Sequence, residues 1–189
     1  MVFLSADHLI EEKNKFNLSI KKHQKYLSNT NIFIFGIKPT AASSEFGYFI
    51  TQKGTKKINK VIKFIEKPNI LKAKRIIAQK AYWNSGMFFL RKDSIINNFK
   101  KYQNSTYKNC LEAVTKSKYR NNIYYLNKRS FNKSKSVSFD YAVLEKTNNI
   151  NAIKLNLNGI KNLSKERVLR ELYKIFKLKN IDILLENVE

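Results

Sequence analysis

The sequence contains little cysteine, proline or glycine. The single cysteine, Cys110, excludes an internal disulfide and fits a reducing compartment, so we expect a cytoplasmic protein. Two prolines and five glycines form no linker-like stretch within the 189 residues, which favours one domain. Long hydrophobic runs are also absent, because no apolar stretch approaches the ~18–20 residues of a membrane span. We therefore expect no membrane-embedded segment.

Acidic residues are scarce, with 14 Asp and Glu against 37 Lys and Arg, and the net charge is +23. Such an excess suits polyanionic partners. The lysines are nevertheless spread in short, separate groups, and the chain has neither an arginine-rich block nor the aromatic and basic pattern of an RNA-binding strand. We interpret the charge as a solvated surface and do not expect nucleic acid. A preference for phosphorylated small molecules fits this interpretation.

Hydrophobic residues make up 43% of the chain, enough for a folded core. Short apolar runs alternate with segments of helical periodicity, which predicts an α/β layered domain with a mixed, mostly parallel sheet. The expected strands cover 2–5, 31–37, 48–51, 58–68, 86–91 and 151–157. The expected helices cover 11–28, 70–80, 93–102, 106–117 and 139–147. Residues 158–189 predict an amphipathic helical tail.

Polar side chains stand near the predicted strand ends, where open α/β sheets bind ligands. Asp7 follows the first strand, Glu66 and Lys67 end another, Asn84 precedes "GMFFLR", and Asp140 opens a helix. A carboxylate there can hold Mg²⁺, and a lysine can neutralise a phosphate. Asparagine and glutamate side chains can hydrogen-bond to sugar hydroxyls.

Each residue also has a structural interpretation. Asp7 and Asp140 could only cap helices, and Glu66 with Lys67 could be an ordinary surface pair. Trp83 could pack rather than stack on a ligand, and His8 has no second metal-type residue beside it.

Taken in order, four segments resemble one family. They are "FLSADHLI", "FGIKPTAASSEFGYFI", "VIKFIEKPNILKAKRIIAQKAYWNSGMFFLR" and "KSVSFDYAVLEKTNNINAIKLNL", which together run across residues 2–157. The chain resembles the sugar-1-phosphate nucleotidyltransferases, and most closely their mannose-1-phosphate guanylyltransferase branch. "YWNSGMF" followed by "DYAVLEKT" is typical of that branch.

The resemblance implies a Rossmann-like (GT-A-like) fold and the transfer of GMP from GTP to mannose 1-phosphate, which releases pyrophosphate. Asp7 resembles the family's magnesium-binding aspartate, so Mg²⁺ is the expected cofactor. Lys67 matches the lysine that holds the sugar phosphate. Both would therefore be catalytic residues.

The resemblance also implies a set of substrate-binding residues. Gly47 resembles the glycine that lets the backbone approach the sugar, and Glu66 matches the carboxylate that holds sugar hydroxyls. Asn84 matches the sugar-binding asparagine, with Trp83 packing its turn and Gly86 leaving room beside it. Asp140 is a further candidate site residue.

Two family motifs are missing. The sequence has no glycine-rich loop of the form "GGxGTRLxP", which cradles the triphosphate, and no "WxDxGSW" segment after residue 157, where only Gly159 matches. We therefore expect 1–157 to be a partial nucleotidyltransferase domain that keeps the sugar-phosphate half, followed by an unrelated tail. A companion chain would supply the missing loop, and apolar sheet edges would allow a homodimer. The alternative is a non-catalytic sugar-phosphate binder.

Overall fold

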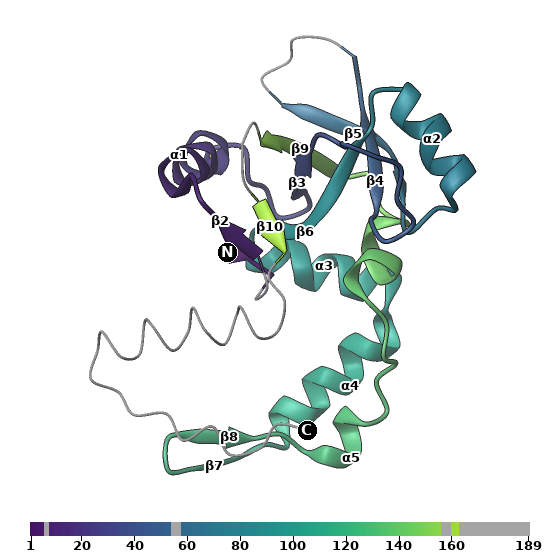
Figure 1. Ribbon diagram of the computed structural model, residues 1–189. Coiled ribbons are helices and arrows are strands. Elements are labelled where there is room, and N and C mark those ends of the chain that lie inside the picture. Colours follow the sequence, from purple (N-terminus) through teal and green to yellow (C-terminus); the bar gives the residue numbers. More distant parts are fainter. Residues whose placement is uncertain (6–7, 54–57, 156–159, 163–189) are drawn as a thin grey trace, which may run out of the picture.

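The computed structural model describes residues 1–5, 8–53, 58–155 and 160–162 (Figure 1). Of residues 160–162 it describes the backbone alone. Asp7 and nearly all of the predicted tail, 158–189, lie outside the described residues. Within the described part of the chain, no helix combines the length and apolarity that crossing a bilayer requires.

A six-stranded sheet forms the centre of the fold, with strand order β1-β6-β3-β9-β5-β4. Because β4 also pairs with the start of β6, the sheet curls until five of its strands close a ring. The strands are β1 (Val2–Phe3), β3 (Ile32–Ile37), β4 (Tyr48–Thr51), β5 (Asn59–Ile65), β6 (Tyr82–Leu90) and β9 (Ile150–Leu155).

The predicted mixed sheet in an α/β domain is confirmed, and four of the six strands run in one direction. The pairing itself is different from a mostly parallel sheet, because β3–β9 is the one parallel pair among the described pairings of this sheet. For the antiparallel pair β4–β5 the reason is the short connection between the two strands, which spans residues 52–58. Such a connection makes an antiparallel pair, whereas a parallel pair needs a longer crossover.

Strand β6 begins earlier than the sequence predicts. It starts at Tyr82 rather than at residue 86, so Asn84 lies within the strand instead of before it. The pairing with β3 shifts register between Ile34 and Gly36, opposite the stretch that contains Gly86. Gly86 has φ +70°, a conformation that favours glycine. The resulting bulge changes which side chains of β6 face the pocket described below.

The core lies on both faces of β3, whose sequence "IFIFGI" is buried at its first five positions. One cluster includes Ile32, Ile34 and Phe49, and another includes Phe33 and Phe35. The predicted strand at residues 2–5 is present only at Val2–Phe3, and its apolar residues, which suggested burial, are not buried, because Phe3 is 40% exposed. Strand β1 pairs with β6 along one edge, and no described strand pairs with its other edge.

The predicted helices are confirmed, with shifted ends. They are α1 (Lys13–Gln24), α2 (Ile70–Ala78), α3 (Lys92–Tyr102), α4 (Asn104–Thr115) and the short π-helix η1 (Asp140–Leu144). The structure adds elements that the sequence did not predict: β2 (His8–Ile10) paired with β10 (Ile160–Asn162), the β7–β8 hairpin (Lys118–Arg120 and Ile123–Tyr125), and α5 (Lys128–Phe131).

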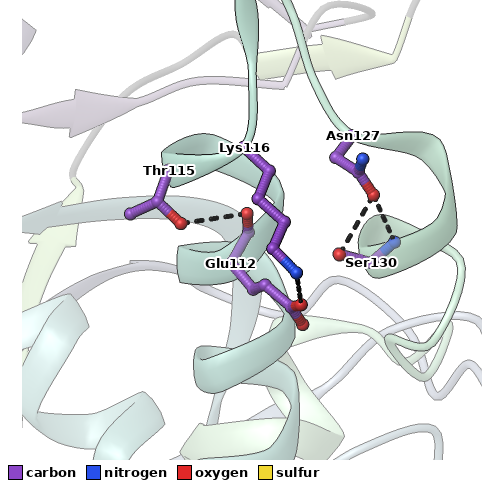
Figure 2. Close-up of polar contacts among 5 residues, drawn as sticks. All are labelled: Glu112, Thr115, Lys116, Asn127 and Ser130. Atoms are coloured by element: carbon purple, nitrogen blue, oxygen red, sulfur yellow. Dashed lines mark hydrogen bonds and ion pairs between the residues drawn. The ribbon is translucent and has the colours of Figure 1, made fainter.

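Helix α4, the β7–β8 hairpin and α5 form a lobe that stands apart from the sheet (Figure 1). Figure 2 shows the polar contacts within it. Asn127 caps α5 by accepting hydrogen bonds from the Ser130 N–H (3.0 Å) and hydroxyl (3.1 Å). Lys116 pairs with Glu112 on α4, and Thr115 donates to the Glu112 carbonyl oxygen at 3.1 Å. The Asn127 N–H donates to the Ala113 carbonyl oxygen at 3.0 Å and joins the two helices.

Candidate functional site

The structure brings four predicted site residues together around one pocket of about 440 Å³. Gly47 immediately precedes β4, Glu66 immediately follows β5, Asn84 lies within β6, and Asp140 opens η1. The pocket therefore forms only when these four segments, separated along the sequence, are assembled by the sheet. The remaining lining residues are Ser5, His8, Ile37, Glu45, Phe46, Trp83, Ser85 and Gly86.

Gly47 leaves space for the carboxyl group of Glu66. A Cβ atom at residue 47 would lie 2.4 Å from Glu66 Oε2, which no packed pair of atoms tolerates. The Gly47 carbonyl oxygen also accepts a hydrogen bond from the Asn84 N–H at 2.7 Å. The absence of a side chain at Gly47 thus allows Glu66 and Asn84 to share one wall of the pocket.

The Asn84 side chain is held in a fixed orientation. The residue is 8% exposed, and its Nδ2 donates to Asp140 Oδ1 at 2.8 Å. Its Oδ1 accepts a longer hydrogen bond from the Gly86 N–H at 3.4 Å. An amide fixed in this way offers its remaining N–H and oxygen lone pairs to a ligand in a defined direction.

Glu66 and Asp140 have carboxyl groups that hold protons more strongly than usual. Burial raises the pKa of Glu66 from 4.5 to about 7, the negative charge of Asp140 adds to the shift, and Lys67 opposes it. Burial also raises the pKa of Asp140, while hydrogen bonds, including the one from Asn84, and the charge of Lys67 oppose that shift. Glu66 Oε2 is buried without a hydrogen-bond partner among the described residues. A ligand hydroxyl would satisfy it.

Lys67 lies beside the pocket rather than in its lining. Its side chain is exposed, and its positive charge acts on both Glu66 and Asp140. Its backbone has φ +41°, which is uncommon for a residue with a side chain and marks a strained turn between β5 and Pro68. Strained backbone of this kind clusters at ligand sites.

Trp83 both packs and lines the pocket, so neither interpretation from the sequence excludes the other. Its ring lies 4.7 Å from that of Phe46, measured between centroids. Its Nε1 is buried without a hydrogen-bond partner within the described residues.

Glu145, which was not among the residues predicted from the sequence, also contacts the site. It follows η1 and accepts a hydrogen bond from the Glu66 N–H at 3.2 Å. Glu145 stands five residues after Asp140 in "DYAVLEK", a segment that the family resemblance already included.

The expected magnesium ligand, Asp7, lies outside the described residues. Ser5 and His8, the described residues on either side of positions 6 and 7, both line the pocket. Among the residues that the structure describes, no group of three or more His, Cys, Asp or Glu side chains could hold a metal ion. A carboxylate at position 7 with substrate phosphate oxygens fits the small oxygen-ligand set that Mg²⁺ prefers, so magnesium stays a prediction.

Comparison with known proteins gives consistent matches. Residues 1–161 match the nucleotidyl transferase family. Over 151 residues the chain is 34% identical to mannose-1-phosphate guanylyltransferase RfbM of Salmonella typhimurium, and it is 33% identical to xanthan biosynthesis protein XanB of Xanthomonas campestris. Each alignment covers 78% of this chain but 31% and 32% of the relatives. The chain therefore spans about a third of the length of the curated relatives it matches.

Two solved structures share the fold. The first is titled mannose-6-phosphate isomerase from Helicobacter pylori, with TM-score 0.74, 26% identity, and coverage of 83% of this chain and 62% of that one. The second is titled mannose-1-phosphate geranyltransferase from Thermus thermophilus, with TM-score 0.69 and 18% identity. It covers 81% of this chain and 43% of that one, and at this identity the likeness shows the fold alone.

Proposed function

Because the chain belongs to the nucleotidyl transferase family, we propose that its pocket binds mannose 1-phosphate as the sugar-phosphate half of a mannose-1-phosphate guanylyltransferase. One observation carries the proposal: Gly47, Glu66, Asn84 and Asp140 line one pocket, with Lys67 beside it. The names of the curated relatives support the choice of sugar. The reaction would join a phosphate oxygen of mannose 1-phosphate to the α-phosphorus of GTP. The bond between that phosphorus and the pyrophosphate leaving group would break.

The residues of this chain would position the sugar phosphate for that reaction. Glu66 Oε2, which has no partner among the described residues, would meet a sugar hydroxyl, and the fixed amide of Asn84 would meet another. Lys67 would neutralise the phosphate as a compact positive charge. Such chemistry depends on positioning and charge neutralisation more than on covalent catalysis.

Magnesium, if bound by Asp7, would supply charge neutralisation at the phosphates. We extend the proposal to a cytoplasmic setting, since Cys110 is the single cysteine of the sequence. A companion chain that supplies the glycine-rich loop, with GTP as second substrate, completes the proposed enzyme. A homodimer and the absence of nucleic-acid binding also stay predictions.

Calorimetry with the unaltered chain tests the binding step directly. We expect saturable binding of mannose 1-phosphate and an affinity at least about tenfold lower after Lys67→Ala, because a charge-assisted contact is lost. Lys63→Ala is the matched control, since Lys63 is an exposed lysine on β5 and does not line the pocket. No binding at millimolar sugar phosphate, or equal losses for the two variants, would contradict the proposal.

A non-catalytic sugar-phosphate binder is the second candidate, since the pocket residues Glu66 and Asn84 with Lys67 beside them would suffice for binding alone. Pyrophosphate release from GTP, mannose 1-phosphate and Mg²⁺, measured with and without a companion chain that supplies the glycine-rich loop, separates the two. Binding of mannose 1-phosphate without release in either mixture indicates the non-catalytic role, whereas release only with the companion chain indicates the enzyme. Rapid release by the isolated chain indicates that it is complete as an enzyme.

A further inference from the structure

Two carboxylates at the ends of one short segment each accept a hydrogen bond from a different residue of the pocket lining. Asp140, the first residue of η1, accepts the hydrogen bond from Asn84 Nδ2 at 2.8 Å. Glu145, the residue after η1, accepts the hydrogen bond from the Glu66 N–H at 3.2 Å. The segment therefore links β6 to the end of β5, two parts of the pocket that are not adjacent in sequence.

We infer that Asp140 and Glu145 are positioning residues: Asp140 orients the Asn84 amide toward the hexose, and Glu145 holds the Glu66–Lys67 turn that presents a cation to the phosphate. This inference rests on the proposed function, because it takes a hexose phosphate as the ligand. Asp140 would serve recognition of the hexose, and Glu145 would serve recognition of the phosphate.

The spacing between the two carboxylates is fixed by the π-helical turn and by the core. The Glu145 N–H donates to the Asp140 carbonyl oxygen at 3.0 Å, which is the five-residue hydrogen bond of a π-helix. Between them, Ala142, Val143 and Leu144 are buried in the main core cluster. A further hydrogen bond from Gln103, the residue between α3 and α4, to the Ala142 carbonyl oxygen (3.3 Å) anchors the turn. The segment can therefore hold the two carboxylates at a fixed separation.

The hydrogen bond to Asp140 fixes the orientation of the Asn84 side-chain amide. An asparagine amide can present either its oxygen or its N–H groups to a ligand, depending on how the side chain is turned. With Nδ2 bound to Asp140 and Oδ1 near the Gly86 N–H, one orientation is selected. A sugar hydroxyl at a fixed position would then be recognised by direction as well as by distance.

Glu145 acts on the other half of the site. Lys67 adopts φ +41°, and strained backbone persists only where surrounding contacts hold it. The hydrogen bond that Glu145 accepts from the Glu66 N–H restrains the peptide immediately before Lys67. The ring of Pro68 fixes the backbone φ of the residue immediately after Lys67. Removing the Glu145 carboxylate would let the Lys67 backbone relax and would move its ammonium group away from the pocket.

Paired binding measurements with mannose 1-phosphate and inorganic phosphate test the two roles. We expect Asp140→Ala to lower the affinity for mannose 1-phosphate about tenfold and to leave phosphate binding unchanged, because the lost contact serves the sugar. We expect Glu145→Ala to weaken both ligands, because Lys67 serves the phosphate. Glu112→Ala is the matched control, since it removes an equal charge from the lobe.

Conservative variants separate positioning from charge. Asp140→Asn keeps an oxygen that can accept from Asn84, so we expect it to restore sugar affinity to within about threefold of the unaltered chain. Asn84→Ala combined with Asp140→Ala should cost little more than either change alone, because the two residues act as one unit. If Asp140→Asn loses as much sugar affinity as Asp140→Ala, or if the two losses add, the inference is overturned.

A measurement without ligand keeps this inference separate from the proposed function. The side-chain amide protons of Asn84 should be protected from exchange in the unaltered chain and in Asp140→Asn, and should lose protection in Asp140→Ala. If the unaltered chain binds no mannose 1-phosphate but shows this pattern, the proposed function fails and the positioning contact stands. Equal protection in all three chains overturns the positioning role of Asp140.

Discussion

The sheet and the lobe of α4, β7, β8 and α5 differ in how far along the sequence their contacts reach. In the sheet region, Asn84 meets Asp140 across 56 residues, and Glu66 meets Glu145 across 79. The side-chain contacts drawn in Figure 2 join residues three or four positions apart. The pocket therefore requires the whole sheet to fold, whereas much of the lobe is held by contacts that form locally.

The two regions also differ in burial. The strands around the pocket contain side chains with no measurable exposure, such as Phe35 and Phe49. In the lobe, Tyr119, Tyr124 and Tyr125 are each more than half exposed. Few buried apolar contacts mean a low free energy of local opening, so we expect the lobe to open more readily than the sheet. The candidate site thus lies in the more deeply buried of the two regions.

The largest effect should come from opening a cavity in the sheet. Phe49 is fully buried and its ring stacks on Tyr82 at 5.8 Å between centroids, so Phe49→Ala should lower the free energy of unfolding by about 3–5 kcal/mol. Val114→Ala, at an exposed position on α4 of the lobe, should change it by at most about 0.5 kcal/mol. Urea denaturation measures both, and similar losses would remove the contrast between the regions.

Two glycines of the sheet region allow stability and binding to be separated. A Cβ at Gly36 would lie 2.4 Å from the buried Phe49 ring, so Gly36→Ala should lower the free energy of unfolding by about 1–3 kcal/mol. A Cβ at Gly47 would instead displace the end of the Glu66 side chain. Gly47→Ala should therefore lower mannose 1-phosphate affinity about tenfold with a smaller loss of stability. Calorimetry with thermal unfolding tests the pair, and unchanged affinity in Gly47→Ala would count against the site.

The titrating carboxylates of the two regions should change the stability of the protein with pH in opposite directions. The pKa of Glu66 is raised from 4.5 to about 7, so between these values the folded chain holds more protons than the unfolded chain. Its contribution to stability is complete below about pH 4.5 and is lost as the pH rises through about 7. The raised pKa of Asp140 acts in the same direction. Because Glu66 is half-buried, solvent screening reduces the size of this effect.

In the lobe, a hydrogen bond from Lys116 lowers the pKa of Glu112, so its small contribution is present above its ordinary pKa and is lost as the pH falls. We expect Glu66→Gln to flatten the decline of stability between about pH 4.5 and 7, and Glu112→Gln to leave that decline unchanged. Denaturation curves across this range provide the measurement. An undiminished decline in Glu66→Gln would show that another group causes it.

The sequence predicted the parts of this protein that depend on local pattern or on the family resemblance. The apolar run of residues 31–37 predicted β3, and the resemblance selected Gly47, Glu66 and Asn84. The position of Asp140 at the start of a predicted helix made it a further candidate, and the structure places all four residues around one pocket. Antiparallel pairing, the bulge at Gly86 and the role of Glu145 were not predicted. Each depends on which distant segments become neighbours, and residue periodicity carries no information on that.

The β7–β8 hairpin was missed for a different reason. All six of its strand residues are exposed, so no alternation of buried and exposed positions marks the segment as a strand. Its turn uses Asn121 and Asn122 with positive φ, a two-residue connection that the sequence "RNNI" could have suggested. Exposed strands are thus recognised by turn chemistry rather than by apolar pattern.

The smallest effect should come from the lobe itself. Asn127 caps α5 through the Ser130 N–H and hydroxyl, so Asn127→Ala should cost about 1 kcal/mol. Because the lobe opens locally, this loss should increase amide exchange in α5 and leave the protection of β3 unchanged. Asn127→Asp, which keeps a capping oxygen, is the matched control and should restore protection. If Asn127→Ala instead lowers protection in β3 equally, the lobe and the sheet unfold as one unit, and the difference between them lies in contact range alone.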